Sequence, residues 1–199
     1  MGFDLHGLNP KRNTAKPEVL TEYKTEEGWT DFVKLEEQGL KNKYFEAKDE
    51  WEDDNPGEYF RNNVWWWRPL WSFVTGVCDD ILTDKDMEQG SYNDGHKISK
   101  TKADRIAKRL YGLLDNGQAK EYEEGYKANL NSLEQLDCDI CEATGKRQEP
   151  PTTGAGNVKC NGCGGTGKKD DWAKSYPFDA DNVRRFANFC ANSGGFRVC

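Results

Sequence analysis

Four of the seven cysteines form two pairs whose spacing suits a single metal ion. The pairs are Cys138 with Cys141 and Cys160 with Cys163, and 18 residues (142 to 159) separate them. Two residues between the members of a pair let one tight turn aim both sulfur atoms at the same point, and two such turns complete a tetrahedron. The spacing therefore predicts a structural zinc ion held by four thiolates.

The surroundings of these cysteines favour a structural role over a catalytic one. Four thiolates fill the coordination sphere of zinc and leave no position for a reactive water. The segment has few apolar residues besides Ile140 and Val158, so metal binding would supply folding energy that burial cannot. A redox-active CxxC pair is the alternative, and two pairs spaced for one metal argue against it. An odd total of seven cysteines also fits reduced thiols better than a disulfide framework.

Glycines complete each cysteine pair into a longer unit. Cys160 begins CNGCGGTG, which matches C-x-x-C-x-G-x-G in full, and Cys138 begins CDICEATG, in which Ala143 replaces the first glycine. Over residues 138–169 only, these units resemble the zinc-finger repeats of DnaJ-type co-chaperones. The resemblance implies two glycine-rich hairpins around one zinc ion. It does not imply a co-chaperone role. A J-domain requires a His-Pro-Asp signature, and neither histidine of this chain is followed by proline.

The segment FRNNVWWWRPLW, residues 60–71, is the second candidate site. Three consecutive indoles cannot all face one core, because neighbours point about 100° apart on a helix and alternate on a strand. Aromatic faces beside guanidinium groups and amides suit a planar base with a phosphate, or a partner protein. The alternative is that the indoles form core and the arginines pair with acidic residues. The candidate binding residues are Arg61, Asn62, Asn63, Trp65, Trp66, Trp67 and Arg68.

Other catalytic signatures are absent from the sequence. It contains no HExxH, HxE or GxSxG motif and no phosphate-binding loop in a convincing context. Cys78 is expected in the core. Asp94 and His96 are expected in a polar loop, which would either line a site or simply be solvated. No catalytic residue is therefore named.

Apolar spacing predicts three long helices in the middle of the chain. The first has Pro69 in its first turn, and the second begins after Ser99 as its N-cap. Between these two helices, Asp84 to Lys97 is predicted to be a loop. The three helices are expected at about residues 68–83, 100–115 and 118–136.

The flanking regions are predicted to contain shorter elements. Residues 1–15 are expected to form a short strand and a turn, and residues 16–54 one or two amphipathic helices interrupted at Gly39. A short helix near the C-terminus is expected to be capped by Asp179 or Asp181.

Together these elements predict a mainly α fold with small β elements. One helical, aromatic-rich domain would comprise residues 1–137 and 170–199, with the zinc hairpin module of residues 138–169 inserted into it. The aromatic residues after the module are expected to return to the same core as the tryptophan segment. They are Trp172, Tyr176, Phe178, Phe186 and Phe189.

Composition narrows the classes of partner. The formal net charge of −7 disfavours non-specific binding to duplex nucleic acid, which requires a basic surplus. No apolar run is long enough to span a bilayer, and the N-terminus fits neither a secretory signal nor a myristoylation signal. We therefore expect a cytoplasmic protein. Aromatic residues make up 12% of the chain and include seven tryptophans, which argues for a folded core.

Most of the chain resembles a set of small proteins encoded mainly by bacteriophages. The residues that carry the resemblance are GFDLHGLNP, GEYFRNNVWWWRPLW, the two CxxC hairpins and the tail FCANSGGFRVC. The resemblance implies a phage origin and a location in a bacterial cytoplasm. It implies no particular activity.

Three functional hypotheses follow. The first is a non-enzymatic phage protein, stabilised by zinc, that binds a host protein or complex. The second is a binder of a small nucleotide-like ligand that sequesters a host signal in counter-defence, and the third is an enzyme of unreadable motif. An exposed aromatic patch would favour the first, a pocket lined by Trp and Arg the second, and a deep pocket of converging carboxylates the third. The sequence does not identify the partner, the oligomeric state or the biological process.

Overall fold

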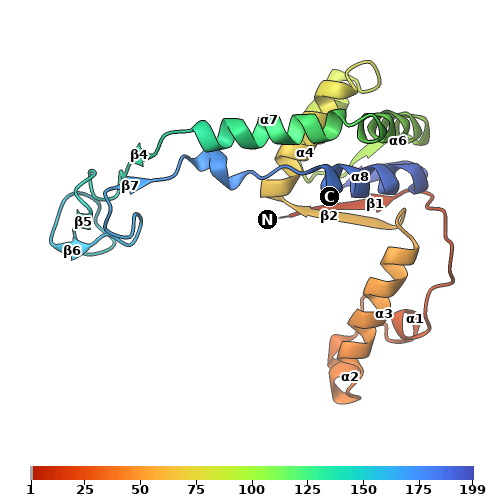
Figure 1. The fold of residues 1–199 in the computed structure, drawn as a ribbon. Coiled ribbons are helices and arrows are strands. Elements are labelled where there is room, and N and C mark those ends of the chain that lie inside the picture. Colours follow the sequence, from red (N-terminus) through yellow and green to blue (C-terminus); the bar gives the residue numbers. More distant parts are fainter. Residues whose placement is uncertain (1) are drawn as a thin grey trace. The chain divides into compact units, whose positions relative to one another are not determined.

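The computed structural model describes residues 2–199 and is mainly helical, with three small antiparallel sheets among these residues (Figure 1). The mainly α fold class with small β elements is thus confirmed. The chain divides into two compact units, the first made of residues 2–120 with Asp179–Cys199 and the second of Glu121–Phe178. The second unit is larger than the module expected at 138–169, because it also holds most of a helix and a returning segment.

A four-stranded sheet forms one layer of the first unit, with strand order β2-β1-β8-β3. Strands β1 (Gly2–Gly7) and β2 (Tyr59–Asn63) are antiparallel, as are β8 (Phe196–Val198) and both of its neighbours, β1 and β3 (His96–Ile98). Residues Phe3, Leu5, Phe196 and Val198 are buried, in the alternation expected of a sheet with one face toward a core.

Helix α4 (Val64–Val77) follows β2 directly, so the predicted helix at 68–83 is wrong at both ends. The side chain of Asn63 accepts hydrogen bonds from the backbone N–H groups of Trp65 and Trp66, at 3.0 and 3.1 Å, and caps the helix one turn earlier than expected. Pro69 therefore lies inside the helix and not in its first turn. Beyond the helix, the N–H groups of Ile81 and Leu82 both donate to the carbonyl of Cys78 in a turn.

Stacked rings make the core of the first unit. Trp67 stacks between Phe3 and Trp71, with ring centroids 5.4 and 5.3 Å away, and meets Phe186 edge-on at 5.7 Å. The Nε1–H of Trp67 donates to the carbonyl of Gly90 at 2.9 Å, and that of Trp71 to Met87 at the same distance. The indole polar groups are thus satisfied inside the core. A side chain at Gly90 would collide with Trp71, since an added Cβ would lie 2.2 Å from its ring.

Two further helices cover this core. Helix α6 (Lys100–Asp115) has Ser99 as its N-cap, as predicted, and α8 (Ala180–Asn192) is capped by Asp179, one of the two caps predicted for it. Each helix buries one apolar stripe at helical spacing. The buried residues are Ala103, Ile106, Ala107 and Leu110 in α6, and Val183, Phe186, Ala187, Phe189 and Cys190 in α8.

The predicted loop between residues 84 and 97 is wrong, because it contains helix α5 (Asp84–Gln89) and begins β3. Thr83 and Asp86 form a reciprocal capping box, in which each side chain bonds the backbone N–H of the other. A T-x-x-D pattern carried this information in the sequence, but the helix it starts is too short for periodicity to reveal.

Residues 16–54, which we call the arm, pack around a core of their own. They form helices α1 (Val19–Glu22), α2 (Phe32–Glu37) and α3 (Lys41–Asp54), with Gly39 between the last two at a φ of +67°, as expected for a break. Fully buried Asn55 ends α3 and bonds the backbone of Asn13 and the hydroxyl of Thr14. The arm core consists of Leu20, Leu35, Tyr44 and Trp51.

The second unit contains most of α7 (Gln118–Ser132), which ends four residues before the predicted end at 136. Two short strand pairs follow, β4 (Leu136–Asp137) with β7 (Lys168–Lys169) and β5 (Lys146–Arg147) with β6 (Val158–Lys159). A 3-10 helix, η1 (Trp172–Ser175), lies after β7.

The aromatic residues after the cysteine module divide between the units, so the expectation of one shared core is wrong in part. Phe186 and Phe189 pack on Phe60 in the first unit, at centroid distances of 5.3 and 5.7 Å. Phe178 instead contacts Tyr122 and Tyr126 in the second unit, at 4.9 and 5.7 Å. The hydroxyl of Tyr126 donates to the carbonyl of Tyr176, and Trp172 is 64% exposed.

Candidate metal centre

The four cysteines singled out by their spacing come together in the second unit. Their sulfur atoms all lie within 4.8 Å of one another, with 3.9 Å between Cys138 and Cys160 and 3.7 Å between Cys141 and Cys163. A metal–sulfur distance of about 2.3 Å places the corners of a tetrahedron about 3.8 Å apart. Three of the cysteines are fully buried and Cys163 is half-buried. The arrangement is compatible with one metal ion.

Two similar turns, residues 138–145 and 160–167, supply the four cysteines and bond each other reciprocally. The N–H of Cys138 donates to the carbonyl of Gly167 at 2.9 Å, and the N–H of Cys160 to the carbonyl of Gly145 at 3.0 Å. Each turn thus fixes the first cysteine of the other. The two C-x-x-C units are therefore related by a local two-fold pattern as well as by sequence.

Both turns pass through left-handed backbone conformations. In the second, Gly164 and Gly165 have φ of +61° and +89°, and in the first, Glu142 and Ala143 occupy the equivalent positions at +49° and +61°. A side chain in this region costs roughly 1–2 kcal/mol. The site thus imposes the same conformation on both turns, although only one carries glycine where the conformation favours it.

The last glycine of each unit is required by close approach. An added Cβ at Gly145 would lie 2.3 Å from the carbonyl oxygen of Gly165, and one at Gly167 would lie 2.1 Å from that of Ala143. Either contact would push the two turns apart. This packing explains why the glycine that both units share stands at the fourth position after the second cysteine.

A threonine closes each turn in the same way. The hydroxyl of Thr144 donates to the carbonyl of Cys141 at 2.6 Å, and that of Thr166 to the carbonyl of Cys163 at 2.8 Å. Each hydroxyl oxygen also accepts the N–H two residues later. These bonds satisfy polar backbone groups around the sulfur atoms.

Backbone N–H groups also adjust the acidity of the thiols. Burial acts to raise the pKa of Cys163, but N–H groups of Gly167 and Gly165 outweigh it and lower the pKa to about 6. The N–H of Gly167 lies 3.3 Å from the Cys163 sulfur. Burial dominates at Cys141 and raises its pKa to about 12. Donors aimed at sulfur favour the thiolate, which is the form that binds metal.

Arg147 ties the Pro/Thr/Gly loop of residues 148–157 to the second turn. Its guanidinium donates to the side chain of Asn161 at 2.8 Å and to the carbonyls of Thr152 and Gln148 at 3.1 and 3.2 Å. The arginine is buried, so these bonds replace water. The long connection between the cysteine pairs is thereby ordered against the site.

The second candidate set does not form one surface, because β2 ends and α4 begins within it. Arg61 is exposed on β2 beside Asp4, whereas Asn62 is buried and donates to Asn182 at 3.1 Å. Asn63 is used as the α4 N-cap. Trp67 is buried in the core. The remaining members, Trp65, Trp66 and Arg68, are half-buried or exposed.

Arg68 does line a cavity of about 440 Å³, together with Trp67, Trp71 and Tyr92. Trp67 and Trp71 are 0% and 3% exposed, because their rings stack on each other and pack in the core. Their N–H groups already bond backbone carbonyls. The cavity therefore presents few aromatic surfaces to a stacked ligand, apart from exposed Tyr92.

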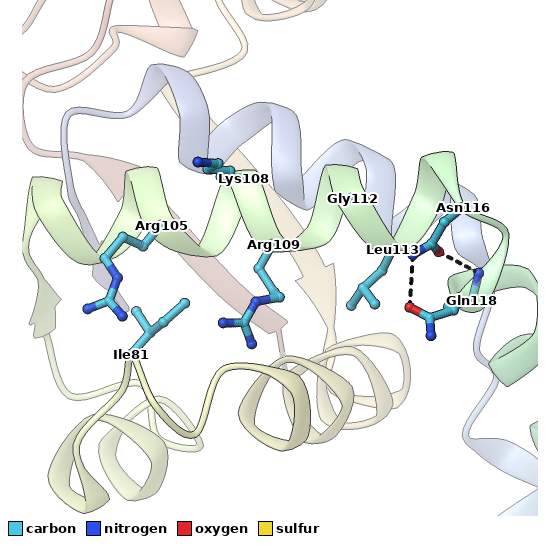
Figure 2. Close-up of a pocket in the computed structure, with 8 residues that line it drawn as sticks. All are labelled: Ile81, Arg105, Lys108, Arg109, Gly112, Leu113, Asn116 and Gln118. Atoms are coloured by element: carbon cyan, nitrogen blue, oxygen red, sulfur yellow. Dashed lines mark hydrogen bonds between the residues drawn. The ribbon is translucent and has the colours of Figure 1, made fainter.

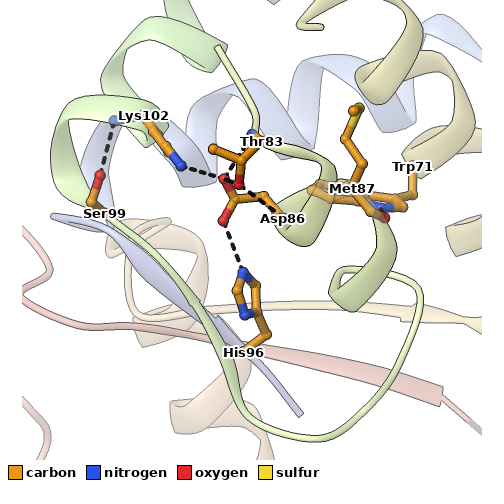
Figure 3. A network of polar contacts seen from close by, with 7 residues as sticks. All are labelled: Trp71, Thr83, Asp86, Met87, His96, Ser99 and Lys102. Carbon is orange, nitrogen blue, oxygen red and sulfur yellow. Dashed lines mark hydrogen bonds and ion pairs between the residues drawn. The ribbon is translucent and has the colours of Figure 1, made fainter.

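Sequence reasoning missed a buried carboxylate, Asp86, which Figure 3 shows at the centre of a polar network. Its Oδ1 lies 2.9 Å from Nε2 of His96, and its Oδ2 pairs with the ammonium of Lys102 and accepts the hydroxyl of Thr83 at 2.7 Å. Burial acts to raise the pKa of Asp86, but bonds from Lys102, Thr83 and His96 outweigh it and hold the pKa well below its usual range. Because both carboxylate oxygens of Asp86 have partners, we interpret the network as a structural contact that joins α5, β3 and α6.

Searches of protein-family models, curated proteins and solved structures matched this chain to none of them. Among residues 2–199, no helix is long and apolar enough to cross a membrane.

Proposed function

We propose that this chain is a non-enzymatic, phage-encoded protein that binds a host protein in the bacterial cytoplasm, with a zinc ion stabilising its second unit. The observation that carries the proposal is a group of exposed apolar side chains on the arm, which we call the arm patch. They are Trp29, Phe32, Val33 and Phe45, which are 74, 43, 70 and 43% exposed. Trp, Phe and neighbouring apolar side chains of this kind anchor protein interfaces when they are left on a surface.

The arm patch is built on an ordered base. The rings of Phe32 and Phe45 stack with centroids 5.8 Å apart, and both contact the buried ring of Tyr44 at 5.7 and 5.6 Å. The arm core beneath holds these rings in place. A surface held in this way loses little conformational entropy when it binds.

The charge of the arm indicates the character of the partner. Residues 16–54 contain thirteen of the 35 acidic residues and six of the 28 basic ones, a net charge of −7 that equals that of the whole chain. The rest of the chain is formally neutral. An apolar patch inside an acidic surround fits a partner whose apolar groove has a basic rim.

The metal is assigned from ligand chemistry. Four cysteine thiolates in tetrahedral spacing suit zinc best among common cellular divalent ions. Because the chain has two CxxC hairpins, one after the other, we propose that residues 138–169 form a zinc hairpin module similar to one pair of DnaJ-type repeats. Its role here is to order residues 138–169.

A site-specific cross-link tests the function. Val33→benzoylphenylalanine is expressed in bacterial cells and cross-linked by light, and Tyr92→benzoylphenylalanine serves as the control because Tyr92 is 54% exposed away from the patch. We expect one host protein to be captured from position 33 and not from 92. Trp29→Ala and Glu37→Lys should each reduce capture without changing the melting temperature, and the purified complex should weaken as salt rises. Equal capture from both positions, or capture unaffected by Trp29→Ala, would refute the assignment.

A further inference from the structure

A cavity of about 560 Å³ lies beside α6 in the first unit. Figure 2 shows Arg105, Arg109 and Leu113 projecting from one side of α6 toward Ile81, while Lys108 projects from another side. The first three residues are four apart in sequence and so lie one above the other on the helix. At the far end, the side chain of Asn116 donates to that of Gln118 at 2.9 Å.

The cavity is cationic in an acidic protein. Helix α6 carries five basic residues and two acidic ones, while the whole chain has a net charge of −7. Lys100 and Lys102 are paired with Asp104 and Asp86, respectively. The two arginines share a single carboxylate, that of Asp80, so one positive charge at the cavity is not balanced by this contact.

The arginines are held in place but keep donors to offer. Arg109 donates to the carbonyl of Val77 and, at 3.0 and 3.1 Å, to the two oxygens of Asp80, whereas Arg105 approaches Asp80 only at 3.4 Å. A guanidinium has five N–H donors, and these contacts use fewer. Both side chains are partly exposed, so a ligand can reach them.

We propose that this cavity binds a small molecule that carries a phosphate group beside a flat or apolar group. The phosphate would bridge Arg105 and Arg109, because two planar guanidinium groups match its oxygens in bidentate geometry. The flat group would cover Leu113 and Ile81. The volume lies within the range of small-molecule sites, roughly 300–1,000 Å³. This site is independent of the proposed host-protein surface.

Calorimetry with defined probes tests the proposal. Adenosine monophosphate and flavin mononucleotide combine both groups, whereas inorganic phosphate and adenosine supply only one. We expect at least one combined probe to bind ~10-fold more tightly than either component, a difference of about 1.4 kcal/mol. In the methyl NMR spectrum, the signals of Leu113 and Ile81 should shift on binding.

Matched variants separate a specific site from charge attraction. Arg105→Gln with Arg109→Gln should weaken the combined probe at least ~10-fold. Lys97→Gln with Lys100→Gln removes the same two charges from exposed positions nearby and should change affinity less than about twofold. Leu113→Gln should weaken the combined probe but leave phosphate binding unchanged.

Three results would overturn the proposal. One is no heat and no methyl shift with either combined probe up to about 5 mM, which corresponds to less than roughly 3 kcal/mol of binding. Another is equal weakening in the arginine and lysine pairs, which would indicate non-specific attraction only. The last is equal affinity for phosphate and the combined probes, which would reduce the site to an anion contact.

Discussion

Trp67 and Cys141 are both fully buried, but different forces hold the chain around them. Trp67 lies among stacked rings and apolar helix stripes of the first unit. Cys141 lies among three other cysteines and reciprocal backbone bonds. Within residues 2–199, Ile140 is the one apolar side chain besides the cysteines that packs against this cluster. One region is therefore stabilised by burial of apolar area, whereas the other has few apolar contacts around four sulfur atoms whose spacing is compatible with a metal ion.

One short chain thus contains two regions that differ in what stabilises them. Substitutions in the ring-packed core around Trp67 should affect the first unit, and changes at the cysteine cluster should affect residues 138–169 of the second. The arm adds a third small core and leaves the arm patch exposed. The following predictions are ordered by the expected size of the effect.

Loss of the metal should have the largest effect. Cys160→Ser should abolish metal binding and disorder residues 138–169, because the binding energy of such a site, on the order of 10 kcal/mol, is also its folding energy. Elemental analysis and amide NMR measure this, with Cys199→Ser as the control outside the cluster. We expect the signals of the first unit to stay in place. Retention of a full metal equivalent would show that Cys160 is not a ligand.

Truncation in the ring-packed core should come next. Leu70 is 1% exposed on α4, so Leu70→Ala should lower the free energy of unfolding of the first unit by about 2–5 kcal/mol. Metal content should not change. Chemical denaturation followed by tryptophan fluorescence gives the value, and Ser72→Ala, on the exposed side of the same helix, should cost under about 0.5 kcal/mol. A loss below 1 kcal/mol for Leu70→Ala would place this side chain outside the core.

The buried Asp86 should give a smaller, pH-dependent effect. Asp86→Asn removes the charge that pairs with Lys102 and His96 and should cost about 2 kcal/mol at pH 7. Because the folded-state pKa of Asp86 lies below the unfolded-state pKa of about 3.9, its contribution is complete above that pH and disappears as the pH falls.

Unfolding free energies of the wild type and Asp86→Asn should therefore converge below about pH 4. Denaturation curves between pH 2 and 7 measure the difference. Asp104→Asn, which removes an exposed partner of Lys100, is the control and should change stability by under about 0.5 kcal/mol. A constant difference across this range would mean that Asp86 acts through packing and not through charge.

The smallest effect should come from the asymmetry between the two cysteine turns. Ala143→Gly should stabilise the metal-bound module by about 0.5–1 kcal/mol, since relief of its positive φ exceeds the added freedom of the unfolded chain. Gly165→Ala, at the equivalent position, should destabilise it by about 1 kcal/mol. Competition with a chromophoric chelator measures both changes. Effects of the same sign would contradict the local two-fold relation.

Local signals predicted several elements correctly. Ser99 caps α6 and Asp179 caps α8, because a cap depends on a side chain and the backbone two or three residues away. The start of α4 was predicted too late, because Pro69 is typical of the first turn of a helix. The residue that caps the helix, Asn63, lies within the tryptophan segment, which was interpreted as a binding motif. Short α5 and β3 were missed, since a single turn or three residues give no period to read.

The sequence was enough to single out the four cysteines that the structure brings together, since two residues between cysteines favour one tight turn and glycines stand beside each pair. The acidic character of the arm also follows from the sequence, because it depends only on the numbers of acidic and basic residues. That Trp67 is buried and Trp29 exposed follows from the tertiary structure, because burial depends on which distant segments pack over a side chain. The same holds for Arg105 and Arg109, which became a cavity wall only when the turn holding Asp80 and Ile81 packed beside α6.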